Sequence, residues 1–543
     1  MSDSEKNIKH DSKREKFVNS KRKFGKKKGK GRPQTEDRSY NGVSIQDREI
    51  RRDIDRGDCG NDPHWYAVSE ALLRDSASFP YSQALGTSFN LYPSSAIGVQ
   101  TMDDYYVPGI CELEYYPTPG ISRDNSSPVN IAARNIYSFV RHANNGHSNY
   151  ESPDLMMYLL AMDSIYSMWA WLVRIYGVAR TYSQKNRYFP LSLLRVMGLD
   201  PDSIIGSLAD LHYFIDSVAC KVGALCVPTT MPLFLRHMWL NTHIWMDEPG
   251  EKSQIYIFNP TGYYIWKEGT SPNPGYLEFN QLKQAAPIDF SMLRSIMETM
   301  INGVMLSQDF NIMSGDIYKA YAGKVWKLES IPADYAVIPE YSAEVLSQIE
   351  NAEAIGDSEF FHTPSVPDLD ITQDPLTGAL QYDPKYDWRP GASFQRILNL
   401  HVDEPTPADT MVATRLKWVA SDIDIQNDGT FYVTAAGSEI VRVVNYYRII
   451  DGQGTLDHKR VWMSINLNDN TFAITVCNNL LSLVPTFRHF PIVYLFRETT
   501  SSPTWKDYKL SSIVTDWDNY TVVGGNLVSM HETALLSEFA VPM

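Results

Sequence analysis

The residues of this 543-residue chain that could most directly do chemistry form a run of cations near its start. The stretch KRKFGKKKGKGR, residues 21–32, holds eight basic side chains: Lys21, Arg22, Lys23, Lys26, Lys27, Lys28, Lys30 and Arg32. Clustered cations neutralise phosphates and release counterions without reading base edges. The run therefore predicts sequence-independent binding to nucleic acid. Phe17 and Phe24 alone offer little for stacking on single-stranded bases.

Charge is segregated along the chain. Residues 1–32 carry thirteen Lys or Arg against four Asp or Glu, whereas the whole chain has a net charge of −15, so the remainder stands at −24. A charged block with few apolar residues cannot offset the entropy of ordering, and residues 1–55 are expected to form a disordered basic arm. Residues 328–384 hold twelve Asp or Glu and no Lys or Arg. We expect this acid-rich stretch to face away from whatever the arm binds.

Composition leaves three interpretations of the basic run open. It is a tether for nucleic acid, a nuclear localisation signal, or a solubilising tail. Runs of eight cations are known in all three settings, so the run alone does not decide between them.

Catalytic and metal-binding motifs are absent from the sequence. It has no G-x-x-x-x-G-K-[ST], G-x-S-x-G, H-E-x-x-H or paired C-x-x-C. Residues 422–429 read DIDIQNDG, but the twelfth position counted from Asp424 is Ala435, where a calcium loop needs Glu. This stretch is predicted to be a hairpin turn. We expect no catalytic residue, no metal site and no cofactor, and no enzymatic activity.

The histidines and cysteines are placed for structure rather than chemistry. His142 and His147 stand five positions apart across a glycine, which suits neither one helical face nor a common zinc motif. His237 and His243 lie among apolar neighbours and are predicted to be core or interface residues. The cysteines are five and scattered, which argues against a disulfide framework and favours a reducing compartment.

Several helices are predicted from capping residues that precede a proline. Ser127-Pro128, Ser152-Pro153 and Asp200-Pro201 each supply a capping oxygen and a fixed φ at the helix start. With left-handed stops expected at Gly146, Gly177 and Gly223, the helices span residues 129–146, 154–177 and 202–223. A fourth, Phe290 to Asn302, begins at the cap Asp289 and stops at Gly303.

Residues 155–173, LMMYLLAMDSIYSMWAWLV, are long and apolar enough to suggest a membrane span. Asp163 lies at the middle of this run, where insertion into a bilayer costs about 3 kcal/mol. A helix that is apolar nearly all round is typical of a protein core. We therefore predict a buried core helix and no stable membrane insertion.

Strands are predicted in the second half of the chain. Residues 253–269 read as two strands around a Pro-Thr-Gly turn. Between Met411 and Cys477, alternating runs are separated by turn residues, which indicates an antiparallel meander. The chain thus reads as helices, then a mixed middle, then sheet.

Several stretches of the globular part resemble the capsid proteins of picobirnaviruses, small viruses with segmented double-stranded RNA. The resemblance rests on these runs: NDPHWY, YSQALG, RHANNGHSNYESPDLMMYLLAMDSIYSMW, TYSQKNRYFP, VGALCVPTTMPLFLRHMW and MHETALLSEFAVP. They lie between about residue 61 and residue 239, and again at residues 530–542. Residues 245–480 show no family pattern.

The resemblance implies an α+β chain with a predominantly helical shell domain and an inserted, β-containing protruding domain, preceded by the disordered arm. The expected division is 1–55 for the arm, 56–245 and 481–543 for the shell, and 246–480 for the protrusion. It also implies two-fold dimers that close into an icosahedral shell around double-stranded RNA, in a virion assembled in the host cytoplasm. We further expect part of the dimer contact to lie in the inserted lobe, because of its exposed position in this layout and its high aromatic content around Tyr256 to Trp266.

Two other functions stay open from the residues alone. One is a monomeric intracellular RNA-binding protein whose basic tail also serves as a nuclear import signal. The other is an RNA-processing enzyme without a recognisable motif, whose catalytic groups converge from distant positions.

Overall fold

The computed structural model describes residues 65, 69–77, 88–89, 105–106, 108–145, 149–181, 189–249, 253–270, 273–282, 286–355, 369–387, 397–420, 430–449, 456–460, 487–498, 508–514 and 520–541. The chain divides into two compact units, Met1–Pro80 and Tyr81–Met543. In the first unit, helix α2 (Glu70–Ala77) has no buried residue. The arm predicted at residues 1–55 lies outside the described residues.

The second unit contains helices and strands in mixed order. Its helices are α3 (Pro128–Ala143), α4 (Ser152–Arg180), α5 (Phe189–Val196), α6 (Pro201–Gly206), α7 (Leu208–Val222), α8 (Pro232–Thr242), α9 (Phe290–Met305), α10 (Gln308–Ala320), α11 (Ala343–Glu350), α12 (Pro407–Ala413) and α14 (Gly524–Glu538). Its longer strands are β3 (Pro108–Pro117), β5 (Ile255–Pro260), β6 (Gly262–Lys267), β7 (Tyr276–Gln281), β13 (Thr430–Ala436), β14 (Glu439–Ile449), β15 (Leu456–Arg460), β16 (Val493–Glu498) and β17 (Tyr508–Val514).

The remaining strands are short. They are β1 (Ser88–Phe89), β2 (Tyr105–Tyr106), β4 (Trp245–Met246), β8 (Thr372–Gln373), β9 (Leu380–Gln381), β10 (Lys385–Asp387), β11 (Ile397–Leu398), β12 (Trp418–Ala420) and β18 (Tyr520–Thr521).

A five-stranded sheet of order β15-β14-β3-β5-β4 lies at the centre of the second unit. Strand β3 pairs antiparallel with β14 and parallel with β5. Its alternate residues Cys111, Leu113 and Tyr115 enter one core cluster, since successive side chains of a strand point to opposite faces. The predicted division at 245/246 passes through this sheet, because β3 lies before it and β5 and β14 lie after it. The division into shell and protrusion stays a prediction.

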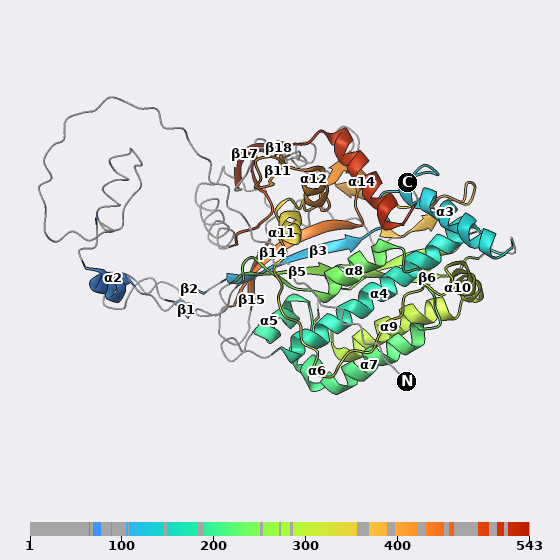
Figure 1. Cartoon of the computed structure of the whole chain (residues 1–543), viewed down its shortest axis with the longest axis horizontal. Helices are drawn as coiled ribbons and strands as arrows, with labels where there is room; N and C mark the ends of the chain where they lie inside the picture. Colours follow the sequence, from blue (N-terminus) through green and yellow to red (C-terminus); the bar gives the residue numbers. More distant parts are fainter. Residues whose placement is uncertain are drawn as a thin grey trace, which may run out of the picture. The chain divides into compact units, whose positions relative to one another are not determined.

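Helix α4 forms the centre of the helical layer, against which α3, α5, α7, α8 and α9 pack (Figure 1). A capping box closes its start, with Glu151 and Asp154 exchanging side-chain and backbone contacts. Of the described residues, this is the helix long and apolar enough to cross a membrane, and 94% of its apolar window is buried inside the protein. The prediction of a buried core helix is confirmed.

The helices begin within one residue of the starts predicted from their capping residues, although Glu151 rather than Ser152 caps α4 and Ser127 makes no side-chain capping bond. The predicted glycine stops are not confirmed. Helix α4 continues through Gly177 to Arg180, and α9 continues through Gly303 to Met305. The segment predicted as one helix from residue 202 to 223 is two helices, α6 and α7, broken at Ser207. Gly223 does end α7, with φ −62° rather than a left-handed value.

The predicted meander is wrong at its middle. Strands β12 and β13 pair antiparallel, as do β14 and β15, but β13 and β14 lie in different sheets. The two strands predicted around the Pro-Thr-Gly turn are confirmed as β5 and β6. Their aromatic residues are core residues, with Tyr256 0% and Trp266 8% exposed. These rings are therefore buried within one chain, whereas the expectation that part of the dimer contact lies in the inserted lobe stays a prediction.

Two glycines within helices, Gly177 and Gly315, differ in how closely other parts of the chain pack against them. A methyl group on Gly177 would lie 2.5 Å from Val337 Cγ2 and 3.0 Å from the Val337 backbone nitrogen, whereas nothing lies within 4 Å of one on Gly315. We expect Gly177→Ala to lower the free energy of unfolding by about 2 kcal/mol through overpacking. Gly315→Ala should raise it by up to about 1 kcal/mol through helix propensity. Urea denaturation of both variants checks this, and a stabilising Gly177→Ala would contradict it.

Candidate functional site

The residues predicted to bind nucleic acid, Lys21 to Arg32, lie outside the described residues, as does the turn at residues 422–429. The nucleic-acid interface therefore stays a prediction. His142 lies exposed in the last turn of α3, and His147 lies outside the described residues. His243 follows α8, half-buried, with its Nε2 3.9 Å from the carboxylate of Glu340.

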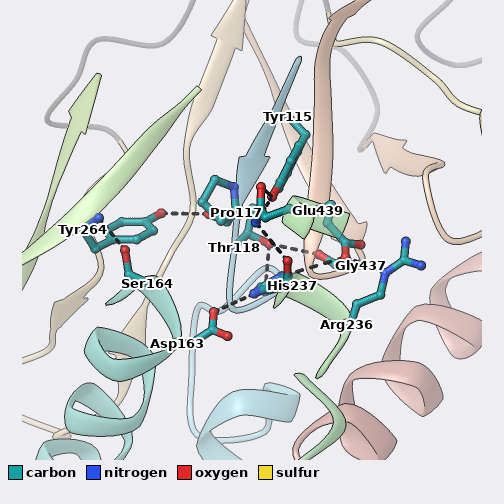
Figure 2. A network of polar contacts seen from close by, with 12 residues as sticks. Tyr115, Pro117, Thr118, Asp163, Ser164, Arg236, His237, Tyr264, Gly437 and Glu439 are labelled. Atoms are coloured by element: carbon teal, nitrogen blue, oxygen red, sulfur yellow. Dashed lines mark hydrogen bonds and ion pairs between the residues drawn. The ribbon is translucent and has the colours of Figure 1, made fainter. Parts of the chain in front are cut away.

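The structure brings together one cluster of buried charged groups that sequence spacing did not connect (Figure 2). Asp163 points from the middle of α4 toward α8, where its Oδ2 lies 2.6 Å from Nδ1 of His237. Both residues are buried, with Asp163 6% and His237 1% exposed. Their contact joins the central helix to its neighbour by an ion pair inside the core.

On the far side of the ring, Nε2 of His237 lies 3.8 Å from Oε1 of Glu439, the first residue of β14. Arg236, the residue before His237, donates from Nε to the same oxygen at 2.7 Å. Its Nη2 donates to Gln348 of α11 at 3.0 Å. The cluster thus alternates in sign from Asp163 through His237 to Glu439 and Arg236, and it links α4, α8, α11 and β14.

An Asp–His pair is also part of a nucleophilic triad, but among the residues that the structure describes no nucleophile stands at the third position. The nitrogen that would take a proton from a nucleophile faces the carboxylate of Glu439 instead of a hydroxyl or thiol. The Ser164 hydroxyl accepts a hydrogen bond from the Tyr264 backbone N–H at 2.9 Å (Figure 2). The adjoining cavity, about 20 Å³, has room for about one water molecule and none for a substrate.

The described residues include no group of three or more His, Cys, Asp or Glu placed to hold a metal ion. The role that this geometry supports for the buried cluster is structural: it links α4, α8, α11 and β14. Next to the cluster, the Thr118 hydroxyl donates a hydrogen bond to the Gly437 carbonyl at 2.9 Å. This bond joins the end of β3 to the turn between β13 and β14. Tyr115 and Asn241 also exchange hydrogen bonds between β3 and α8. The arrangement fixes the helical layer to the end of β14.

Burial and neighbouring charges set the protonation of the cluster. Burial lowers the pKa of His237, but the charge and hydrogen bond of Asp163 and the charge of Glu439 outweigh it and raise the pKa to about 9. Burial raises the pKa of Asp163, although His237 opposes it. Burial also acts to raise the pKa of Glu439, but Arg236 and His237 hold it below its usual value. His237 is therefore a cation at neutral pH.

The C-terminal helix α14 adds a carboxyl group to this cluster. Burial and the charge of Glu439 raise the pKa of Glu538, the last residue of α14, while Arg236 and His237 oppose the rise. Sequence reasoning missed Glu538 and Glu439 entirely. It identified His237 as a core residue, which is confirmed.

Comparison with known proteins identifies the class of protein. A family model described as picobirnavirus capsid protein matches residues 65–417. The capsid protein precursor of human picobirnavirus, strain Human/Thailand/Hy005102/-, is 30% identical over 518 residues, covering 89% of this chain and 91% of the relative. A crystal structure of the picobirnavirus capsid matches with a TM-score of 0.73 at 22% identity, covering 88% of this chain and 98% of that chain.

The fold likeness confirms the predicted α+β class. The family match and the relative define the chain as a viral capsid protein, which has a structural role in the virion. The chain belongs to the picobirnavirus capsid protein family. The resemblance expected from its sequence motifs is thereby confirmed.

The pKa of His237 predicts that alkaline pH weakens the fold. Because the folded-state pKa is raised from 6.5 to about 9, the stabilisation is complete below pH 6.5 and is lost as the pH rises through 9. We expect the free energy of unfolding to fall by about 3 kcal/mol between pH 6.5 and pH 9.5. Denaturant titrations at a series of pH values measure this loss.

Two matched substitutions test the assignment to His237. His237→Gln removes the titrating group, so its unfolding free energy should be lower at pH 6.5 and flat up to pH 9.5. His142→Gln, on the exposed side of α3, should keep the wild-type pH dependence. A His237→Gln variant that still loses about 3 kcal/mol over this range would show that another group is responsible.

Proposed function

We propose that this capsid protein forms two-fold dimers that assemble into an icosahedral shell around double-stranded RNA in the host cytoplasm. In this proposal the basic arm holds the RNA without reading its sequence, through the eight cations from Lys21 to Arg32. The shell is built by residues 56–245 and 481–543, and residues 246–480 carry the protrusion.

The observation that carries the RNA-binding part is the segregation of charge. Eight of twelve residues at positions 21–32 are cations, while the chain beyond residue 32 has a net charge of −24. A body of that charge repels phosphate over most of its surface, so attraction to RNA must come from a local concentration of cations. With all eight engaged, the logarithm of affinity falls with the logarithm of salt concentration with a slope of about −7.

The assembly part is supported by the family and by the exposed surface. The curated relative is a capsid protein precursor, and a solved structure of the picobirnavirus capsid has the same fold. Closed shells need both self-complementary and head-to-tail contacts on one subunit, so large apolar residues on several surfaces are expected. Exposed side chains of this kind occur on or directly after several helices of the second unit, among them Phe139, Tyr213 and Leu306.

Removal of residues 1–32 separates the two parts of the proposal. The shortened chain should still form particles, since the contacts between subunits lie in the folded part. Its particles should hold no nuclease-protected RNA, because the cations of the arm are gone. Light scattering measures the particles, and RNA extraction after nuclease treatment measures the cargo.

A second variant controls for the loss of chain length. Neutralising Asp3, Glu5, Asp11 and Glu15 to Asn or Gln leaves the arm full length and more basic, so RNA retention should equal or exceed that of the wild type. If the shortened chain packages RNA as well as the full chain, the assignment of RNA binding to the arm is wrong. If the full chain forms no particles at any salt or pH, the assembly proposal is wrong.

A further inference from the structure

Helix α3 presents a basic outer face. Its sixteen residues include no Asp or Glu, and its exposed side includes Arg134, Phe139, Arg141 and His142. Phe139 is 49% exposed, which is high for a large apolar side chain. Arg134 and Arg141 are seven residues apart, so they lie on one side of the helix about 10 Å apart.

The end of α10 continues this basic face. The ring of Phe139 packs against Tyr321, just after α10, with ring centroids 5.0 Å apart. Lys319 and Tyr318 precede it in the last turn of α10, both exposed, and Tyr318 is 53% exposed. We call the exposed surface made by Arg134, Phe139, Arg141, His142, Tyr318 and Lys319 the basic face. At about 100° per residue, Phe139 lies about 140° round α3 from Arg134, at the edge that meets Tyr321.

Carboxylates next to the basic face hydrogen-bond to hydroxyl or backbone groups rather than to its cations. Asp316 accepts a hydrogen bond from the Tyr150 hydroxyl at 2.9 Å. Glu151 and Asp154 close the capping box at the start of α4. Arg134 donates to the Asn125 carbonyl and Arg141 donates to the Tyr137 hydroxyl at 3.0 Å, and both acceptors are neutral. Among the described residues no ion pair joins Arg134, Arg141 or Lys319 to a carboxylate, so their charges can pair with a group from outside the chain.

An acidic strip lies elsewhere on the same unit. We define it as Glu329, Asp334, Ile338, Glu340, Tyr341 and Glu344. It falls within the stretch from residue 328 to 384 that has no Lys or Arg. Its apolar members are exposed, Ile338 by 75% and Tyr341 by 50%. Even with Arg180 at the nearby end of α4 counted, the strip is negative.

The strip is held firmly in place by backbone contacts. The Val337 N–H donates to the Gly177 carbonyl at 3.2 Å, and the Tyr176 hydroxyl donates to the Ala333 carbonyl at 2.7 Å. The Glu340 N–H donates to the Ile244 carbonyl at 2.9 Å. The first two bonds tie the strip to the C-terminal end of α4, and the third ties it to the segment after α8.

The two surfaces therefore lie at opposite ends of one helix. Tyr150, which contacts Asp316 of α10, directly precedes the capping residue of α4, whereas the strip contacts Gly177 and Tyr176 near its other end. A helix of 29 residues is about 42 Å long, so the two surfaces cannot meet within one chain. Figure 1 shows α3 and α10 at one end of α4 and α5 and α6 at the other.

We propose that the basic face of one copy docks on the acidic strip of a second copy, as a head-to-tail contact between capsid subunits. The inference rests on the proposed assembly into a shell. Opposite charge is matched across the contact, and each surface adds exposed aromatic or aliphatic residues, the composition found at the centres of protein interfaces. Because the two patches differ, the contact is heterologous and extends from copy to copy until a rotation closes it.

Nucleic acid is the competing partner for the basic face. Phosphate would satisfy Arg134, Arg141 and Lys319, but a duplex backbone offers no apolar partner to Phe139 and Tyr318. It would also leave the exposed Ile338 and Tyr341 of the acidic strip uncovered. A second copy of the chain satisfies both surfaces at once, which is why we favour it.

Charge reversal tests the contact in the full-length protein. Arg134→Glu with Arg141→Glu places like charges across it, and so does Glu329→Lys with Asp334→Lys. Each double variant should raise the protein concentration needed for particle formation at least about tenfold at low salt, measured by light scattering. The chain with all four substitutions has both surfaces reversed and should assemble at close to the wild-type concentration. Arg134→Lys with Arg141→Lys keeps the charges and should assemble normally.

Each outcome is distinct. If the wild type forms particles and the two double variants do so at the same concentration, the head-to-tail contact is wrong while the proposed assembly stands. If the fourfold variant is no better than the double variants, the two surfaces do not face each other. If Arg134→Glu with Arg141→Glu assembles normally but loses RNA that the wild type retains, the basic face binds nucleic acid and the proposal is overturned. Circular dichroism and thermal unfolding confirm that each variant is folded.

Discussion

A charged group at the middle of the most deeply buried helix constrains much of the second unit. Asp163 lies in α4 among side chains that are almost all buried, and an ionised carboxylate in such surroundings is stable only beside an opposite charge. No residue one turn away in α4 is a cation, so the partner must come from another element. His237 of α8 supplies it, and α8 is thereby held at one position along α4.

The need for an opposite charge then applies to each further member of the cluster. A buried His237 cation beside one carboxylate still has its Nε2 side exposed to a low-dielectric interior, and Glu439 of β14 lies there. Glu439 in turn receives Arg236, which also bonds α11. Removing one member leaves an uncompensated buried charge, which is far more costly than removing a surface ion pair. We infer that the cluster fixes how the helical layer meets the central sheet, a structural role suited to a subunit that must keep one shape.

The sequence contained the signals for helix starts but not for helix ends or strand partners. Proline and capping side chains act within one turn, so α3 and α9 begin where predicted and α4 begins one residue earlier. Gly177 failed as a stop because Val337 and Tyr335, about 160 positions later, pack where a side chain would be. Strand pairing is equally non-local: β3 pairs with β5 and β14, and the two residues between β13 and β14 separate strands of different sheets.

The same distinction applies to the buried cluster. Asp163 stands out in the sequence as the one charged residue in the apolar run from residue 155 to 173. A carboxylate in a core helix without a basic residue three or four positions away needs a partner from elsewhere in the chain, a cation or a hydrogen-bond donor, or it stays protonated. Nothing in the sequence, however, distinguishes His237 from His243 as that cation, because the choice depends on which face of α8 meets α4. That face is decided by packing along the whole helix, not by the residues beside either histidine.

The distribution of charged residues along the chain affects whether two negatively charged subunits can attract each other. Bodies with a net charge of −24 repel each other, yet this repulsion acts across whole subunits, over distances that salt screens beyond about 8 Å at physiological ionic strength. Matched charges at a contact act over a few ångströms and are screened less. In the proposed contact, arginines concentrated on a helix without carboxylates meet carboxylates on a stretch without cations, which would let local attraction exceed the overall repulsion. An even mixture of both signs over the surface would have the same net charge without this advantage, so the segregation itself, rather than the total, favours assembly.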